Sequence, residues 1–117
     1  KTPPGTGLSC SQFGGHVFLH SPGHDSLKGR LSNVEITNAG QAFRLGRYAL
    51  HFHLVGDVKH SYVKQCAIHH SHNRAIAIHG VNHLRLIQNV AYNAKGNTIF
   101  IEDGVERWYV FVVCGCL

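Results

Sequence analysis

The sequence predicts an all-β protein, a parallel β-helix of about three to four coils. Two observations carry this prediction: one strand pattern recurs along the chain, and the recurrences keep a regular spacing. The pattern stands in three segments, Leu50-His51-Phe52-His53, Ile76-Ala77-Ile78-His79 and Ile99-Phe100-Ile101-Glu102. The second and third segments are 23 residues apart. A period of roughly 20 to 50 residues is typical of stacked units that bury their apolar faces against one another.

Each repeating unit consists of short strands. Runs of Val, Ile, Leu, Phe and Ala alternate with polar residues, and no window sustains the spacing of an amphipathic helix. A leucine-rich repeat has a similar length, but its consensus is missing, and helical repeats need two helices per unit. Two further sets of positions repeat in register: Leu31, Val63 and Leu86, and Ile36, Ile68 and Ala91. The residues that lengthen the first unit fall in one loop, Gln41 to Arg47.

Stacking of parallel strands places equivalent residues above one another, about 4.8 Å apart. The pattern therefore predicts two inward apolar ladders, Leu50 with Ile76 and Ile99, and Phe52 with Ile78 and Ile101. Alternation turns the residues between them outward, in two files: His51, Ala77 and Phe100, then His53, His79 and Glu102, with Asp103 beyond. Asn38, His70 and Asn93 occupy an equivalent turn position, where amides can satisfy turn backbone groups.

We expect the chain to be an incomplete coil within a longer polypeptide whose flanking domains are missing. It contains no Met, and neither end reads as a polar cap for an apolar cross-section. Residues 1–106 form the predicted β-helix fragment, and residues 107–117 form an apolar tail that drops the repeat. The tail is either one more buried strand or an abnormal or truncated chain end. No segment reaches the roughly 20 apolar residues of a membrane span.

Charge and cysteine content narrow the function classes. Lys and Arg total 11 against six Asp and Glu, and eleven His residues gain charge as the pH falls. Such a surface suits a polyanion, but no basic run interleaved with aromatics indicates nucleic-acid binding. Of the four cysteines, Cys66 lies at an inward position and is expected to pack as a small apolar side chain.

A series of ordered motifs resembles one known family from about Gln12 to Glu106. The motifs are Phe13-Gly14-Gly15-His16, Gly40-Gln41, Gly46-Arg47-Tyr48-Ala49-Leu50-His51-Phe52-His53-Leu54-Val55-Gly56-Asp57, Ser61-Tyr62-Val63, Cys66-Ala67-Ile68-His69-His70, Asn73-Arg74-Ala75, His79-Gly80 and Phe100-Ile101-Glu102-Asp103-Gly104-Val105-Glu106. They resemble the β-helix region shared by fibrocystin-L, the cell migration-inducing hyaluronan-binding protein and transmembrane protein 2, a cell-surface hyaluronidase. The short link from Asp57 to Tyr62 looks more like fibrocystin-L, Ala49 stands where Pro is usual, and the resemblance stops after Glu106.

This resemblance implies a right-handed parallel β-helix in an extracellular or membrane-anchored protein. Some family members promote or perform hyaluronan depolymerisation, whereas fibrocystin-L is viewed as a receptor-like or surface-coat protein. Fold alone does not decide between these functions. Three hypotheses follow: a face that binds an anionic glycan such as hyaluronan or a cell-surface protein, part of a hyaluronan-depolymerising enzyme, and an architectural stalk.

The outward files carry the candidate chemistry. As acid, base or catalytic groups we single out His51, His53, His79, Glu102 and Asp103. His53, His79 and Glu102 are the predicted ligands of a divalent metal, with zinc favoured by imidazole and calcium the other choice. The predicted substrate contacts are Arg47 and Arg74, which could neutralise a uronate, and Asp57 in a turn.

Structural roles compete with each of these interpretations. Stacked histidines can hydrogen-bond to one another or to a covering loop, and Asp57 can simply serve its turn. A second group of histidines, His69, His70 and His72, is expected to be structural or to capture a metal. A third group, His16, His20 and His24, is spaced like a helix face, but Pro22 and Gly23 favour loop or strand.

Overall fold

The computed structural model describes residues 12–21, 27–107, 110–112 and 115–116. These residues form twelve β-strands and no α-helix. The strands are β1 (Val17–His20), β2 (Arg30–Ser32), β3 (Glu35–Thr37), β4 (Leu50–Asp57), β5 (Tyr62–Lys64), β6 (Ala67–His69), β7 (Ile76–Asn82), β8 (Arg85–Ile87), β9 (Val90–Tyr92), β10 (Ile99–Ile101), β11 (Val110–Val112) and β12 (Gly115–Cys116). None of the described segments is a helix long and apolar enough to cross a membrane.

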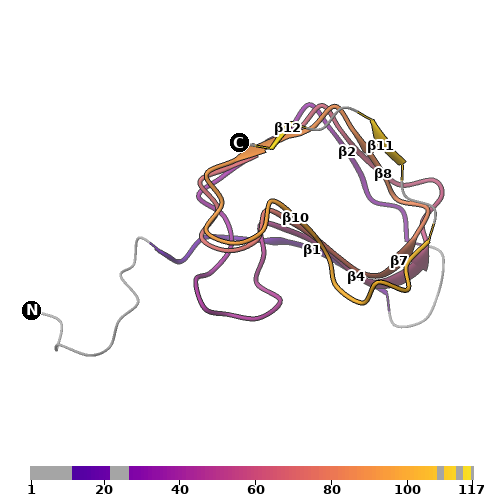
Figure 1. Ribbon diagram of the computed structural model, residues 1–117, viewed down its shortest axis with the longest axis horizontal. Helices are drawn as coiled ribbons and strands as arrows, with labels where there is room; N and C mark the ends of the chain where they lie inside the picture. Colours follow the sequence, from indigo (N-terminus) through magenta and orange to yellow (C-terminus); the bar gives the residue numbers. More distant parts are fainter. Residues whose placement is uncertain (1–11, 22–26, 108–109, 113–114, 117) are drawn as a thin grey trace, which may run out of the picture.

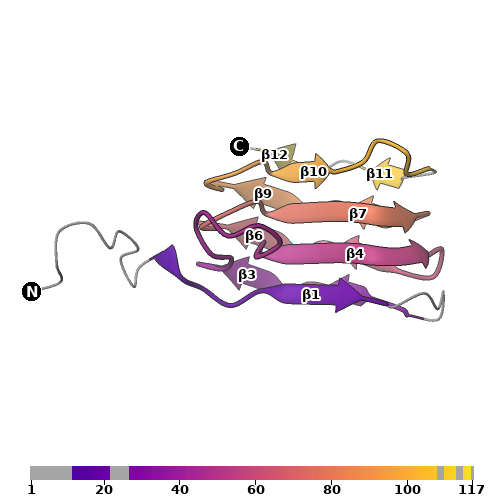
Figure 2. The same cartoon turned by 90° about the horizontal axis from the view of Figure 1, so that it is seen from below.

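The strands form three parallel sheets, each of which takes every third strand of the chain. Their orders are β1-β4-β7-β10, β11-β8-β5-β2 and β12-β9-β6-β3. Consecutive strands therefore pass from the first sheet to the second, to the third and back, so that three strands make one coil. The coils overlie one another in Figure 1 and stack as layers in Figure 2. The prediction of an all-β fold with parallel strands is confirmed.

The two predicted inward ladders are confirmed by the strand register. Leu50 pairs with Ile76, which pairs with Ile99, while Phe52 pairs with Ile78, which pairs with Ile101. These residues belong to one core, in which the four members from β4 and β7 are fully buried. The short strands follow the predicted register as well, because Leu31, Val63 and Leu86 form one row and Ile36, Ile68 and Ala91 another.

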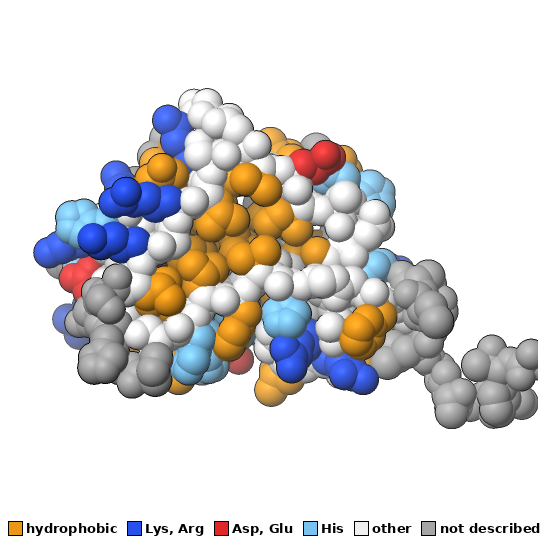
Figure 3. Space-filling model, turned by 180° about the vertical axis from the view of Figure 1, so that it is seen from behind, with side chains coloured by type: hydrophobic (Ala, Val, Ile, Leu, Met, Phe, Trp, Pro, Cys, Tyr) orange, Lys and Arg blue, Asp and Glu red, His pale blue; other side chains and the backbone are white. Residues whose placement is uncertain are grey.

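Strand β1 is a fourth copy of the repeated strand, one that was not predicted from the sequence. Strand β1 pairs with β4 in register, with Val17 beside Leu50 and Leu19 beside Phe52. Its last residue, His20, lies beside His53 and extends the outer file by one position. The strand alternative for His20 is therefore correct. Figure 3 looks at the end of the stack opposite to the one that faces the viewer in Figure 1, and apolar side chains fill the middle of that end.

The corners between the short strands use left-handed backbone at equivalent positions. The residues at the predicted turn position, Asn38, His70 and Asn93, have φ between 50 and 53°. A second corner repeats the conformation at Asn33, Gln65 and Gln88, with φ between 51 and 56°. Short polar side chains tolerate this region better than branched ones, which accounts for the Asn, Gln and His found at these corners. The equivalent turn position is confirmed, but the Asn38 amide donates to the Thr37 hydroxyl and not to the backbone.

A buried amide ties neighbouring coils together at the inward position shared by Cys66 and Asn89. The Asn89 Nδ2 group donates to the Val63 carbonyl at 2.8 Å, and its Oδ1 accepts the Cys66 N–H at 3.0 Å. Both Cys66 and Asn89 are buried. Cys66 packs in the core as predicted. At a break between strands, the Asn89 side chain thus provides hydrogen-bond partners for the Cys66 N–H and the Val63 carbonyl, which would otherwise lack them.

The predicted apolar tail continues the sheets where the structure describes it. Strand β11 pairs with β8 and strand β12 pairs with β9, both in parallel. Of the two alternatives for the tail, these segments therefore show the strand. The domain boundary at residue 106 and the nature of the chain end stay predictions. His24 and the residues at 22–23 lie outside the described residues, as do Cys10 and Cys114.

Candidate functional site

Three histidines meet on the outer face of the sheet formed by β1, β4, β7 and β10. His51 and His53 come from β4, and His79 lies beside His53 on β7. The ring centroids are 5.0 Å apart for His51 and His53 and 4.7 Å apart for His53 and His79. One nitrogen from each ring lies within 4.8 Å of the corresponding nitrogens of the other two. We call these three residues the histidine cluster.

The structure differs from the sequence prediction in the exposure of His51. It pairs with Ala77 in the expected outward file, yet both residues are buried, His51 with 2% of its surface exposed. The cause is that Tyr48 and the 41–47 loop cover His51, which the alternation of the strand cannot predict. Tyr48 packs against the His51 ring at 4.8 Å between centroids, and the His51 Nδ1–H donates to the Gly46 carbonyl of the 41–47 loop at 3.1 Å.

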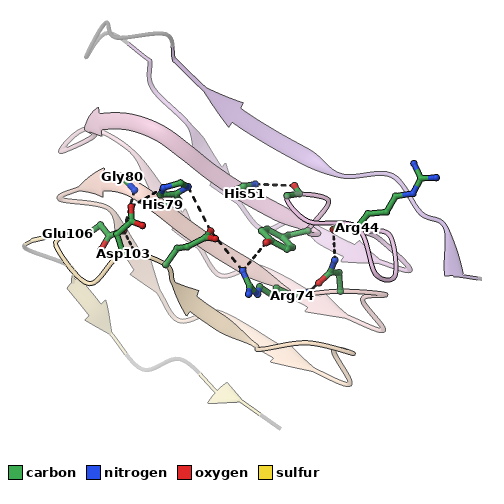
Figure 4. A network of polar contacts seen from close by, with 11 residues as sticks. Arg44, His51, Arg74, His79, Gly80, Asp103 and Glu106 are labelled. Atoms are coloured by element: carbon green, nitrogen blue, oxygen red, sulfur yellow. Dashed lines mark hydrogen bonds and ion pairs between the residues drawn. The ribbon is translucent and has the colours of Figure 1, made fainter.

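The carboxylates of the outer file lie around His79. Asp103 Oδ2 is 2.9 Å from His79 Nε2, and Glu102 Oε2 is 3.8 Å from His79 Nδ1 (Figure 4). The sequence therefore correctly brought His53, His79, Glu102 and Asp103 to one place. His20, the member that it missed, donates from Nδ1 to the His53 carbonyl at 3.0 Å, and its ring lies 5.3 Å from that of His53.

Burial keeps the centre of the cluster neutral. Desolvation lowers the pKa of His51, opposed by its hydrogen bond to Gly46 and reinforced by His53. Desolvation also lowers the pKa of His53, and the neighbouring His79 and His20 lower it further. These two residues therefore gain charge at a lower pH than an ordinary histidine does. Their nitrogens stay available as lone-pair donors near neutral pH.

Arg74 borders the cluster on the side of Glu102. Its guanidinium lies 3.6 Å from the centre of the Phe100 ring, and it donates to the Tyr48 hydroxyl at 2.8 Å. The closest oxygen of Glu102 is 3.9 Å away, at the limit of an ion pair. Stacking and the hydroxyl contact thus fix the position of the guanidinium, while its charge is only partly compensated.

Arg47 borders the cluster on the side of β1. Its NH1 group lies 2.9 Å from His16 Nε2, and among the described residues it has no carboxylate partner. Arg47, Leu45 and the pair His51 and His53 line one hollow of about 260 Å³, together with Phe18 and Gly46. The structure therefore places both predicted arginines next to the histidine cluster.

Asp57, the third predicted substrate contact, is engaged elsewhere. It lies at the far end of β4, where its Oδ1 accepts the Lys59 N–H at 3.0 Å and lies 3.1 Å from His83 Nδ1. The backbone hydrogen bond from Lys59 is the main cause of its lowered pKa. The turn role that the sequence offered as an alternative accounts for these contacts.

The turn histidines form a separate polar group on another sheet. His69 Nε2 is 2.7 Å from Glu35 Oε1, its Nδ1 is 2.7 Å from His70 Nδ1, and Tyr92 stacks on its ring. These partners already use both nitrogens of His69, which favours the structural role over metal capture. His72 contributes its backbone N–H to the Ala39 carbonyl.

Glu106 stabilises the turn that carries Asp103. Its Oε1 accepts the N–H groups of Gly80 at 3.2 Å and Asp103 at 3.3 Å. Burial opposes its ionisation, but these and other backbone N–H groups outweigh burial, so the pKa of Glu106 is lowered overall. Apart from the position of Glu106 after Gly104, nothing in the sequence predicts this role.

Replacing Glu106 by Gln tests this turn. A carboxylate with a lowered pKa stabilises the fold above its ordinary pKa of 4.5, and this contribution is lost as the pH falls through the lowered value. We expect Glu106→Gln to reduce the free energy of unfolding by about 1 kcal/mol at neutral pH and by much less near pH 3. Urea unfolding of both proteins across this pH range measures the difference. A difference that does not change with pH would contradict the assignment.

Comparison with known proteins identifies the class of β-helix protein to which the chain belongs. A model of the CEMIP β-helix family matches residues 12–115, and the matched stretch thus continues past Glu106. The chain belongs to this family. It is 52% identical to fibrocystin-L of Mus musculus and 50% identical to fibrocystin-L of Homo sapiens, each over 106 residues. The resemblance predicted from the sequence motifs is confirmed.

The similarity covers most of this chain but little of its relatives. Both fibrocystin-L comparisons cover 88% of the chain and 2% of the relative. A G8 domain-containing protein of Dictyostelium discoideum is 39% identical over 94 residues, which are 80% of the chain and 6% of that protein. No solved structure matches. The chain spans about 2% of the length of fibrocystin-L.

Proposed function

We propose that the chain is a right-handed parallel β-helix at the cell surface or outside the cell whose outer β1-β4-β7-β10 face binds an anionic glycan of the hyaluronan type. Right-handed crossovers join parallel strands of one sheet in about 98% of cases, which supports the handedness. The family and the parallel topology support the coil. The observation that carries the glycan proposal is the pair of arginines that flank the histidine cluster.

The two arginines border neighbouring hollows of the same face. One hollow is lined by Arg47 with Phe18, His51 and His53, and the other by Arg74 with Arg44, Tyr48 and Asn73. Leu45 lines both, so the hollows meet at the 41–47 loop. A chain that carries one carboxylate per repeat can contact both guanidinium groups from a single bound strand. Guanidinium groups form strong, oriented hydrogen bonds with carboxylates.

Exposed apolar side chains add a surface for sugar rings. Phe43 is 93% exposed and Leu45 is 83% exposed on the 41–47 loop, beside Arg44. Phe18 is partly exposed and stacks on His20 at 5.7 Å between ring centroids. Flat apolar faces next to positive charge fit an amphipathic polysaccharide, because one face of each sugar ring is apolar and its carboxylate is anionic. The same surface would serve a protein partner with acidic side chains.

Binding is tested by replacing Arg47. We expect the full chain to retain hyaluronan oligosaccharides, with affinity that falls as salt rises, and Arg47→Ala to weaken binding about tenfold through loss of one charged hydrogen bond. Isothermal titration measures both. Arg47 suits the test because it is exposed and, among the described residues, its side chain is hydrogen-bonded to His16 and not to the core.

Lys64→Ala is the matched control, since it removes one exposed positive charge from β5 on a different sheet. It is expected to bind hyaluronan like the unaltered protein, and uncharged dextran is expected not to bind. Equal losses in the two variants would indicate attraction by net charge alone. Absence of retention would favour the architectural stalk.

A depolymerising enzyme is the second candidate, favoured by the contact of His79 with Asp103. A histidine held by a carboxylate is a typical acid or base, and Glu102 lies on its other side. Under this hypothesis high-molecular-weight hyaluronan becomes shorter on incubation, and His79→Ala abolishes the shortening. Retention without shortening supports the binding function.

A further inference from the structure

The side chains of the histidine cluster are arranged like the ligands of a metal site. The rings of His51 and His79 each contact another group through one nitrogen, and His53 lies between them. One nitrogen of each of the three rings lies within 4.8 Å of the others. His51 shows this most clearly: its Nδ1–H is used by the Gly46 carbonyl, so its Nε2 carries the lone pair. That Nε2 is buried and has no hydrogen-bond partner among the described residues.

His79 is oriented in the corresponding way from the opposite side. Its Nε2 lies 2.9 Å from Asp103 Oδ2, so the N–H stands there and the lone pair stands on Nδ1. A carboxylate behind a histidine is the usual outer partner of a metal-bound imidazole, because it fixes the tautomer and raises the basicity of the ligand. Nδ1 faces Glu102 Oε2 at 3.8 Å, which supplies an anionic fourth group.

His53 completes the set between the other two. Its Nδ1 is buried and, like Nε2 of His51, has no hydrogen-bond partner in the part of the chain that the structure describes. Buried nitrogens without a partner are costly in a folded protein, and two of them lie here beside a third imidazole. A cation at the centre would satisfy all three lone pairs together.

We propose that His51, His53 and His79 bind one zinc-type divalent cation, with Glu102 as the fourth ligand and Asp103 as the residue that positions His79. The sequence predicts His53, His79 and Glu102 as metal ligands, and the geometry adds His51 as a further ligand. This inference does not rest on glycan binding, because every ligand belongs to the chain itself.

The donor set selects the class of metal. Three imidazoles and one carboxylate suit zinc, cobalt, nickel or copper, whereas calcium takes six to eight oxygens, roughly twice as many ligands as this site offers. In a tetrahedral zinc site with bonds of about 2.1 Å the ligand atoms lie about 3.4 Å apart. The widest pair here is within 4.8 Å, and rotation of the partly exposed His53 and His79 rings closes the difference.

Metal titration of the full chain tests the site. We expect one high-affinity zinc ion per chain and, with cobalt in its place, the intense visible absorption of a tetrahedral complex. His53→Ala and His79→Ala are expected to weaken zinc binding by about 100-fold or more, and Asp103→Asn by about 10-fold to 100-fold with unchanged stoichiometry. His51 is left intact because its burial makes loss of folding a competing explanation.

The matched control is His70→Ala, which removes a histidine from the turn group on another sheet. It is expected to bind zinc like the unaltered chain, and circular dichroism of each variant verifies the strands. The proposal is overturned if no zinc is bound, if cobalt binds without a tetrahedral spectrum, or if binding follows His70 and not His53 and His79. Because no glycan is present, failure here leaves the Arg47 test unaffected.

Discussion

Phe52→Ala is expected to reduce the free energy of unfolding by about 3–5 kcal/mol, the range for removing a large aromatic side chain from a packed interior. Phe52 is fully buried and forms the centre of the second inward ladder, between Leu19 on β1 and Ile78 on β7. The parallel coils cannot close on the space because their backbones are fixed by the ladder hydrogen bonds. A loss of this size is a large part of the 5–15 kcal/mol that is typical of a folded domain.

The measurement is equilibrium urea unfolding, with the midpoint and slope compared between variants. Leu54→Ala, two residues further along β4, is the control because Leu54 is about half exposed. We expect it to cost less than about 1 kcal/mol. Similar losses at both positions would show that the burial of Phe52 is not the cause of its effect.

Asn89→Ala is expected to cost about 2–4 kcal/mol, although it removes only a small polar side chain. The change leaves the Cys66 N–H and the Val63 carbonyl without their partners, and each buried unpaired group costs about 1–3 kcal/mol. Asn89→Asp keeps the acceptor for Cys66 but loses the donor to Val63 and buries a carboxylate, so we expect it to be at least as destabilising.

Gln88→Asn provides the control for this position. Gln88 is exposed beside Asn89 and has left-handed backbone, which Asn tolerates well. Unfolding in urea should show a change within about 0.5 kcal/mol. If Asn89→Ala were equally mild, the amide bridge between the coils would contribute little.

The core of the fold was predictable because it depends on local alternation and on repetition. Leu50, Ile76 and Ile99 occupy equivalent places in three copies, and stacking follows from that equivalence without knowledge of any other contact. The copy in β1 was missed because the 41–47 loop enlarges the spacing from Val17 to its partner Leu50 beyond that between the later copies. Its Val-Phe-Leu-His order was nevertheless a usable signal, since it repeats the apolar and polar order of Leu50-His51-Phe52-His53.

The strand positions of the candidate site could be predicted from the sequence, but the burial of His51 under the 41–47 loop and Tyr48 could not. Alternation placed His53, His79 and Glu102 on one face, and they lie there. It also predicted an exposed His51, whereas the 41–47 loop and Tyr48 close over that ring. Side chains that fold back from a loop form contacts that no period in the sequence records. The engagement of Asp57 with Lys59 and His83 depends likewise on the turn geometry at the end of β4.

Because of the register shift between His53 and Gly56, the length of a coil can vary without moving the histidines of the outer face. Strand β4 carries an extra residue there, yet His53 still pairs with His79 before the shift, and Asp57 pairs with Asn82 after it. An added residue at this place is absorbed as a local bulge and displaces nothing upstream. Lineages could therefore gain or lose a single residue at the bulge, downstream of the histidines, without rebuilding the face.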